Sequence, residues 1–166
     1  MELKTERLLI REFVQEDAPF ILDILNSKGW LEFIGDRGVR TLEDAQRYIQ
    51  ERFSDKYSLS PYNMYAIDRT EDSTTVGMCG LVNRDFLEHI DVGYALLPQF
   101  EGKGYAFEAA AAMLHYAKKQ LQHSTVAAII TPNNEGSARL LQKLNFRFSE
   151  EITRDNERLH LYLNTD

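Results

Sequence analysis

Apolar positions recur along the chain with two spacings, every second residue in some segments and every third or fourth residue in others. Alternation over two residues is typical of a half-buried strand, and a period near 3.6 residues is typical of an amphipathic helix. Alternating or β-branched runs predict strands at 5–13, 63–69, 74–83, 89–98, 125–131 and 159–163. The helical period and its start signals predict helices at 15–27, 41–57, 105–120 and 134–144.

Signals at the ends of these elements refine the picture. Asp17 is expected to cap the helix 15–27, with Pro19 tolerated in its first turn. Thr41 is expected to cap the helix 41–57, and Asp44 stands where a capping box places its acid. The helix 105–120 is expected to bury a stripe made of Phe107, Ala110, Leu114, Ala117 and Leu121.

Strands dominate the first half of the pattern and alternate with helices in the second half. That order favours a mixed α/β sheet with helices on its faces. No repeat, low-complexity tract or polar linker interrupts the 166 residues, of which 43% are hydrophobic. We therefore expect residues 1–166 to form a single domain with its own core.

Composition excludes several classes of function. The net charge of −7 is the opposite of what a nucleic-acid groove requires, and it suits an amine partner, although many cytosolic proteins are as acidic. No apolar run approaches the roughly 20 residues of a membrane span, and the N-terminus has no apolar secretory core. Cys79 is the only cysteine, so neither an intrachain disulfide nor a Cys-rich zinc site is possible. We expect a cytoplasmic protein without a metal, in which Cys79 is an inert, buried strand residue.

The segment "PQFEGKGYAFEA" (98–109) places two glycines at the start of a predicted helix, directly after a strand. Gly102 and Gly104 allow the main chain to turn with its N–H groups aimed at one point. The first turn of a helix carries about half a positive charge, so this segment favours a phosphate site. A P-loop needs Ser or Thr where Gly104 stands, and a Rossmann fingerprint needs glycine at Phe107. Neither of those two phosphate motifs is therefore present.

Three motifs in order give this turn a context. "DVGYALLPQFEGKGYAFEA", followed by "NNEGSARLLQKLNF" and preceded by the opening "TERLLIRE", resembles the GNAT (Gcn5-related N-acetyltransferase) superfamily. The likeness is to its ribosomal-protein N-terminal acetyltransferase (RimJ/RimL-like) branch and spans almost the whole chain. It implies the GNAT fold, a mixed sheet splayed between the strands 89–98 and 125–131. It also implies acetyl-CoA, the acetyl thioester of coenzyme A, as co-substrate.

The resemblance assigns coenzyme contacts to specific positions. The turn's main-chain amides would bind the diphosphate, Gln99 would shape the turn, and two leucines of the strand would offer main-chain groups to the pantetheine arm. Lys103 could also touch a phosphate, though a solvated lysine is the simpler interpretation. The residues concerned are Leu96, Leu97, Gln99, Gly102, Lys103, Gly104 and Tyr105.

Acyl transfer from a thioester also needs a group that protonates the departing thiolate or donates a hydrogen bond to it. Many relatives carry an Asn at the start of the last helix and a Tyr seven residues later as general acid. Asn134 matches that Asn, where it could contact the pantetheine, cap the helix or do both, but the later position holds Leu141. The resembled branch has Ser where Ser137 stands, so we expect Ser137 to stabilise the thiolate by a hydrogen bond. The alternative is a serine that serves only the helix start.

The general base is less well specified. Asp91 matches an acidic strand position of histone-type relatives, and its neighbours on that face are small. A solvated acid, Glu88, His89, a water relay or no dedicated base are alternatives. The segment 28–40, expected to be a loop, lies where relatives admit the acceptor. Trp30 in that loop is therefore a candidate wall of the substrate pocket, or else a core residue.

Together these features predict an acetyl-CoA-dependent N-acetyltransferase. The first acceptor hypothesis is the N-terminal α-amino group of a protein such as a ribosomal protein. A small amine, either a polyamine or an amino acid, is the second hypothesis, which the acidic net charge suits. A coenzyme-binding sensor without turnover is the third. The chain is expected to act as a monomer or a homodimer.

Overall fold

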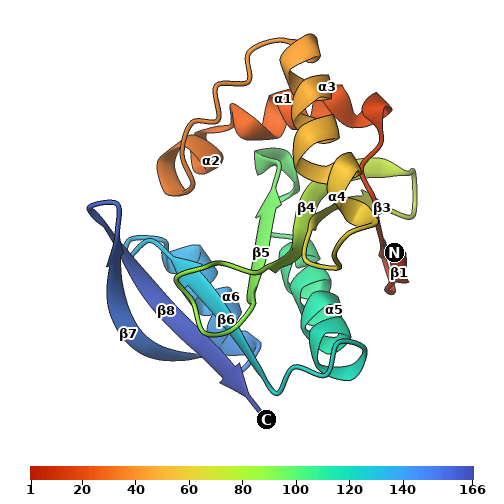
Figure 1. Ribbon diagram of the computed structural model, residues 1–166. Coiled ribbons are helices and arrows are strands. Elements are labelled where there is room, and N and C mark those ends of the chain that lie inside the picture. The colour runs from red at the N-terminus through yellow and green to blue at the C-terminus, as the bar shows by residue number, and fades with distance from the viewer.

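The computed structural model describes residues 1–166, and its strands form one eight-stranded sheet (Figure 1). The strand order is β1-β2-β3-β4-β5-β6-β8-β7, and every neighbouring pair is antiparallel except β5 with β6. The strands are β1 (Leu3–Lys4), β2 (Leu8–Arg11), β3 (Met64–Arg69), β4 (Thr74–Val82), β5 (Asp91–Leu96), β6 (Thr125–Ile130), β7 (Arg147–Arg154) and β8 (Glu157–Thr165).

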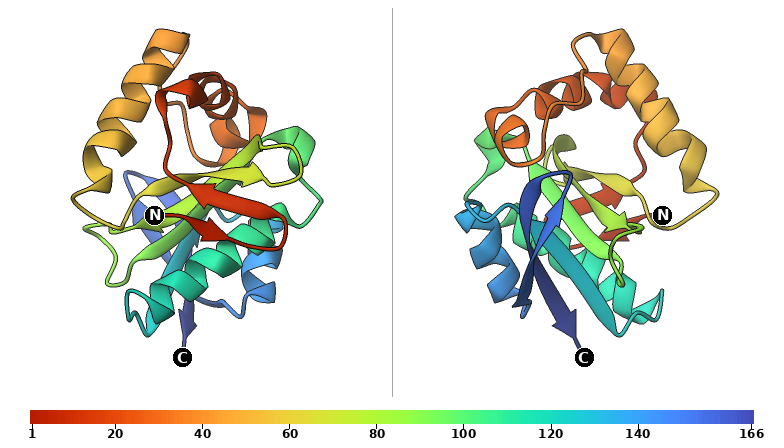
Figure 2. Two further views of the ribbon diagram at one scale, coloured as in Figure 1. Left: turned by 90° about the vertical axis from the view of Figure 1, so that its right-hand side faces the viewer. Right: turned by 60° about the vertical axis from the view of Figure 1, so that its left-hand side comes forward.

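Helices cover both faces of this sheet (Figure 2). One face carries α1 (Ala18–Leu25), α2 (Lys28–Phe33), α3 (Leu42–Ile49) and α4 (Asp55–Tyr57), with a π-helical turn, Gln50–Ser54, joining the last two. The other face carries α5 (Tyr105–Lys119) and α6 (Glu135–Lys143). No helix has the length and apolar character needed to cross a membrane.

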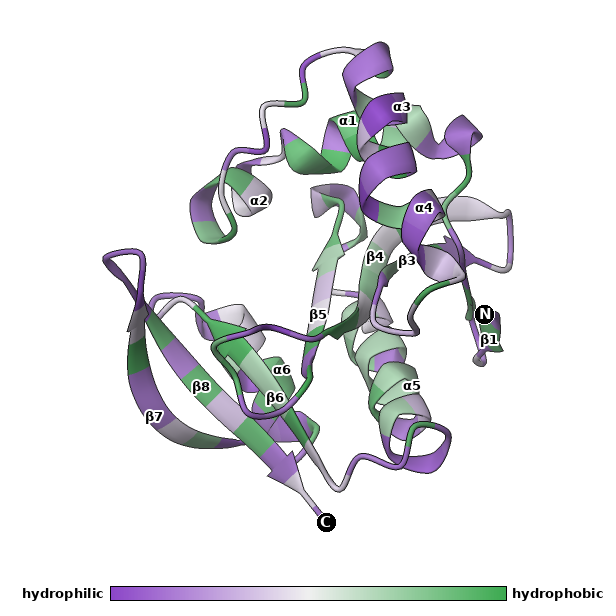
Figure 3. Ribbon diagram, viewed as in Figure 1, coloured by the Kyte–Doolittle hydropathy of each residue, from purple (hydrophilic) through white to green (hydrophobic).

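The core has two parts because side chains alternate between the faces of a strand. Tyr65 packs on the α5 side and its neighbour Ala66 on the α1–α3 side. Cys79 is fully buried in the α5-side cluster, as predicted, and burial raises the pKa of its thiol. Figure 3 shows hydrophobic residues on β6 and along α1 and α5, whereas the α3–α4 helix is mainly hydrophilic.

The predicted splay of the sheet is confirmed. β5 and β6 run parallel but share a single residue pair, Asp91 with Ala127, after which they diverge (Figure 1). β4 and β5, by contrast, pair over six residues from Gly77–Leu96 to Val82–Asp91. The divergence leaves one edge of β5 without a neighbouring strand over its second half.

Most predicted elements are present, and the exceptions have local causes. The helix α2 lies in the segment expected to be a loop, where the Ser27 hydroxyl caps it by accepting a bond from the Trp30 amide. β7 was not predicted because its side chains are nearly all exposed and show no apolar alternation. The buried stripe of α5 also differs from the prediction, because Phe107 is 41% exposed and Leu114 is only partly buried. The residues of α5 that are buried are Tyr105, Ala109, Ala110, Met113 and Ala117.

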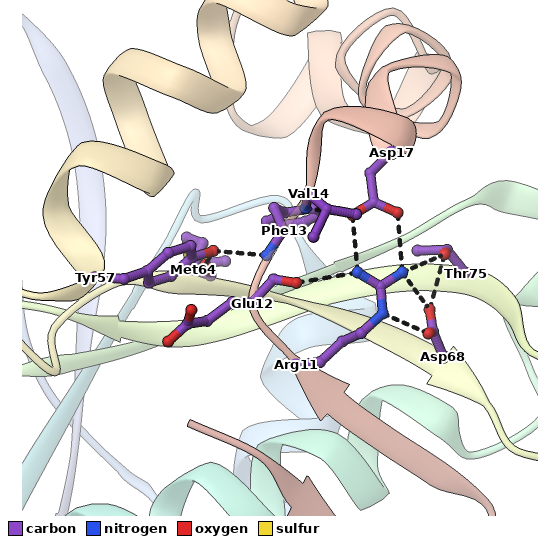
Figure 4. Close-up of polar contacts among 9 residues, drawn as sticks. All are labelled: Arg11, Glu12, Phe13, Val14, Asp17, Tyr57, Met64, Asp68 and Thr75. Atoms are coloured by element: carbon purple, nitrogen blue, oxygen red, sulfur yellow. Dashed lines mark hydrogen bonds and ion pairs between the residues drawn. The ribbon is translucent and has the colours of Figure 1, made fainter.

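The predicted cap at Thr41 is confirmed, with Asp44 completing the capping box. Asp17, however, does not cap α1 through its side chain. Its carboxylate instead accepts bonds from the Val14 amide at 2.9 Å and from both terminal nitrogens of Arg11, at 2.8 and 2.9 Å (Figure 4).

Arg11 is the centre of a network that joins β2, β3 and the start of α1 (Figure 4). Its Nε donates to Asp68 at 2.6 Å, and Asp68 also accepts a bond from Thr75 at 2.8 Å. Asp17 and Asp68 are both buried. The hydrogen bond to Asp17 is the largest of the effects that raise the pKa of Arg11, so the guanidinium stays charged between two buried carboxylates.

Candidate active site

The glycine turn before α5 has the conformation that its sequence predicts. Gly102 and Gly104 have φ angles of 76° and 82°, a region that side chains with a Cβ rarely adopt. The amides of Gly102, Lys103 and Gly104 donate no hydrogen bond within the protein, and no side chain caps the helix start. Unpaired N–H groups at the start of a 15-residue helix form an anion site of the kind that binds phosphate.

Arg7, near the N-terminus, contacts this turn and the first turn of α5 through its guanidinium. Its Nη1 donates to the Lys103 carbonyl at 2.9 Å, and its guanidinium lies 4.7 Å from the Tyr105 ring centre. Its Nε donates to Glu108 at 2.7 Å, which neutralises the one acid in the first turn of α5. Gln99 is expected to shape the turn, but its exposed side chain makes no hydrogen bond to it, and the side chain that does is Arg7.

Main-chain groups of β5 face the gap between β5 and β6 at every second residue. The Leu97 amide donates to the Val76 carbonyl of β4 at 2.9 Å, so Leu97 offers no free amide to a ligand. Bonding direction alternates along a strand, so the main-chain groups of Tyr94 and Leu96 point to the opposite edge, where no strand pairs with them. Leu96 therefore has the free main-chain edge predicted for it, and the second residue with such an edge is Tyr94, not Leu97.

A cavity of about 1340 Å³ follows this edge from the glycine turn to α2 and the α3–α4 helix. Seven of the predicted site residues line it: Trp30, Asp91, Leu96, Gly102, Gly104, Asn134 and Ser137. The side chains of the other four do not. Leu97 and Tyr105 are buried in the core, and Gln99 and Lys103 are exposed, the latter with its ammonium 5.9 Å from the Phe100 ring centre.

Three buried polar side-chain atoms of this protein lack a hydrogen-bond partner, and all three belong to residues that line this cavity. They are Nε1 of Trp30, the hydroxyl of Tyr94 and Oγ1 of Thr131. Leaving a buried donor or acceptor unpaired costs about 1–3 kcal/mol, so such atoms are rare in folded proteins. A ligand or ordered water in this cavity would provide the missing partners.

The start of α6 brings two hydroxyl groups together. Asn134 caps the helix by accepting the Ser137 amide at 3.2 Å, so this part of the prediction is confirmed. The Ser137 hydroxyl makes no hydrogen bond within 3.5 Å and stands beside Tyr94 of β5. Burial raises the pKa of Tyr94 to about 12, and the nearby Ser137 hydroxyl opposes that rise. Leu141, where relatives place a tyrosine, is fully buried in the core.

Asp91 lies at the point where β5 and β6 part, and its side chain is 2% exposed. Burial raises the pKa of its carboxyl, while the Arg84 guanidinium, whose Nε lies 2.8 Å from Oδ1, works against that rise. Asp91 is therefore a buried carboxylate with one charged partner. Arg84 lies in the loop between β4 and β5, and no local sequence signal identifies it as the partner of Asp91.

Comparisons with known proteins agree with this geometry. A family model described as an acetyltransferase (GNAT) domain matches residues 7–147. YnaD, an N-acetyltransferase of Bacillus subtilis (strain 168), is 32% identical over 162 residues, which cover 95% of this chain and 91% of that protein. The crystal structure of a GNAT-family acetyltransferase from Bacillus anthracis has a TM-score of 0.81 and 25% identity, covering 99% and 98% of the two chains.

A structure of RimL, a ribosomal L7/L12 α-N-protein acetyltransferase in complex with coenzyme A, has a TM-score of 0.84. Its identity to this chain is 14%, so it compares the fold alone, over 99% of this chain and 98% of that one. The family model spans most of the sequence, and the YnaD likeness spans nearly all of it. The chain therefore belongs to the GNAT family and is an acetyl-CoA-dependent N-acetyltransferase.

Proposed function

We propose that the acceptor is the N-terminal α-amino group of a protein, such as a ribosomal protein, and that Ser137 assists the departure of the coenzyme thiolate. The observation that carries the catalytic part is the unpaired Ser137 hydroxyl, which lines the cavity at the start of α6. RimL, which shares the fold, is named for such an acceptor. An α-amino group has a pKa near 8, against about 10.4 for lysine, so a weak base suffices to deprotonate it.

The residues of the turn fit the coenzyme's diphosphate. The free amides of Gly102, Lys103 and Gly104, with that of Tyr105, would hold it at the positive end of α5. The free main-chain edge of Tyr94 and Leu96 would bind the amide-bearing arm. Bound in this way, the coenzyme supplies an activated acetyl group beside β5.

Transfer then needs a neutral amine nitrogen, which attacks the carbonyl carbon while the carbon–sulfur bond breaks. Asp91 is the proposed base that takes the amine's proton, since it lines the cavity and has a raised pKa. Ser137 donates a hydrogen bond to the sulfur as negative charge develops there. Tyr94 remains protonated at physiological pH, and its hydroxyl, which is unpaired and close to that of Ser137, would donate to the Ser137 oxygen once the coenzyme is bound and so orient that hydroxyl.

The acceptor assignment is tested by mass spectrometry of peptide products. Wild-type protein with acetyl-CoA is expected to acetylate a peptide that has a free α-amine. The matched control, the same peptide with its α-amine blocked and a lysine left free, is expected to react at least about tenfold more slowly, in line with the difference in amine pKa. Preferential reaction of the blocked peptide or of spermidine would contradict the assignment. Absence of transfer to every amine would favour a coenzyme-binding sensor.

The role of Asp91 predicts a change in pH dependence. Because burial raises its pKa, the wild-type rate is expected to fall on the acidic side at a pH above the ordinary Asp value of about 3.9. Asp91→Asn is expected to lower kcat/KM by about 100-fold and to remove that acidic limb. Glu88→Gln, in the loop nearby, serves as the control and should keep the wild-type kcat/KM and the acidic limb of the pH profile. An unchanged acidic limb in Asp91→Asn would place the base elsewhere.

A further inference from the structure

Cations line the half of the cavity that borders α2 and the α3–α4 helix, where the proposed acceptor would bind. This acceptor half consists of the lining residues from α2, the loop after it, the α3–α4 helix, the start of β3, the β4–β5 connection and the first residue of β5. Its charged members are Arg37, Arg52, Lys56, Arg84 and a single acid, Asp91. Arg84 already pairs with Asp91 at 2.8 Å. The acceptor half therefore carries an excess of positive charge inside a chain whose net charge is −7.

The remaining cations of this half have no partner. Of the twelve arginines in the chain, nine form an ion pair with a carboxylate. The three without a pair are Arg37, Arg52 and Arg147, and the first two line the acceptor half. The Lys56 ammonium, in the same half, likewise forms no ion pair. Arg37, Arg52 and Lys56 are exposed to solvent, so their charges are free to pair with a ligand that enters the cavity.

The π-helical turn presents two of these cations in one row. Ala45, Ile49 and Phe53 are spaced by four residues and all three are buried, which the wider π turn permits along a continuous helix. The adjacent row, also spaced by four, is Tyr48, Arg52 and Lys56, and all of its members line the cavity. The Arg52 guanidinium lies 5.8 Å from the Tyr48 ring centre, so it is directed along this row.

Trp30 adds an independent observation on the opposite wall. Its side chain lines the acceptor half and is 92% buried, and its Nε1–H has no acceptor. The indole N–H can only donate, as can the guanidinium and ammonium groups opposite it. Groups that only donate, three of them positively charged, favour an anion, and an excess of one sign of charge in a cleft repels ligands of that sign.

We propose that the acceptor amine carries carboxylates close to its reactive nitrogen, as an acidic protein N-terminus does. This inference rests on the proposed function and specifies its substrate class. It argues against the alternative of a polyamine acceptor, because the local charge of the acceptor half is opposite to that of the whole chain. Arg37, Arg52, Lys56 and the Trp30 indole would bind the carboxylates while Asp91 faces the amine.

The test compares two peptides that differ only in charge. One begins with serine followed by two aspartates, and its twin has two asparagines instead. Wild-type protein is expected to show a kcat/KM about tenfold higher for the aspartate peptide, a preference that weakens as salt is added. Arg52→Gln combined with Lys56→Gln is expected to raise KM for the aspartate peptide about tenfold, with little change for the asparagine twin. Arg47→Gln, on the same helix but outside the cavity, is the control.

The outcomes separate this inference from the proposed function. Equal use of both peptides, preference for the asparagine twin or for spermidine, or an equal loss with both peptides in the double variant would overturn the inference while leaving N-terminal acetylation intact. Failure of wild-type protein to acetylate either peptide would instead remove the proposed function. Free aspartate is included as a third acceptor. Its use at the rate of the aspartate peptide would support the carboxylate preference and assign it to a small amino acid.

Discussion

Replacing Arg11 with methionine is expected to lower the free energy of unfolding by about 3 kcal/mol or more. The guanidinium bridges Asp17 and Asp68, and both carboxylates are buried (Figure 4). Methionine fills a similar volume but leaves two carboxylates without a counter-charge. A typical domain is stable by only about 5–15 kcal/mol, so this loss is a large share of the total. Urea unfolding followed by circular dichroism measures it.

Two further variants show whether charge or packing is responsible. Arg47→Met removes an exposed arginine with one weak partner, 3.6 Å away, and is expected to change stability by less than about 0.5 kcal/mol. Adding Asp17→Asn and Asp68→Asn to Arg11→Met removes the unpaired charges and is expected to recover part of the loss. An Arg11→Met protein as stable as wild type would show that the network contributes no net stability.

Ser137→Ala is expected to lower kcat by about 100-fold while changing the affinity for acetyl-CoA by no more than about twofold. The hydroxyl is proposed to act only when charge develops on sulfur, so its loss affects the transition state rather than binding. Tyr94→Phe is expected to lower kcat by about tenfold, because the phenol is proposed to orient Ser137. Steady-state kinetics of thiol release measure kcat, and calorimetry measures the affinity.

The kcat of the double variant, compared with that of each single variant, tests whether Tyr94 acts through Ser137. If Tyr94 acts through Ser137, the double variant is expected to be no slower than Ser137→Ala alone. Ser149→Ala, on the exposed strand β7, controls for the loss of a serine and should behave as wild type. A Ser137→Ala protein with full turnover would assign the hydroxyl to the helix start only, and additive effects would mean that Tyr94 acts independently.

Local signals in the sequence predicted the features that depend on neighbouring residues. The positive φ angles of Gly102 and Gly104 follow from the need for glycine at such turns. Asn145, with a φ of 64°, ends α6 in the left-handed conformation in which Asn is the next-best residue after Gly. In both cases the residue type and its immediate neighbours determine the backbone.

Features that join distant segments could not be predicted in this way. The Arg7–Glu108 pair that steadies the glycine turn spans 101 residues, and the approach of Tyr94 to Ser137 depends on how α6 packs beside β5. Whether Tyr94 or Leu97 has free main-chain groups depends on which edge of β5 pairs with β4. That register cannot be read from a two-residue period of apolar side chains. The charge of the acceptor half likewise emerges only when four separate segments meet.

The single pair between β5 and β6 has a mechanical consequence. Each half of the sheet is continuous within itself, so main-chain bonding couples the halves at one rung only. A coenzyme arm bonded to the open edge of β5 and reaching α6 would add a second point of attachment. Loading the acetyl donor and stiffening the joint between the halves would then be one event, so that the enzyme is most rigid when its donor is in place.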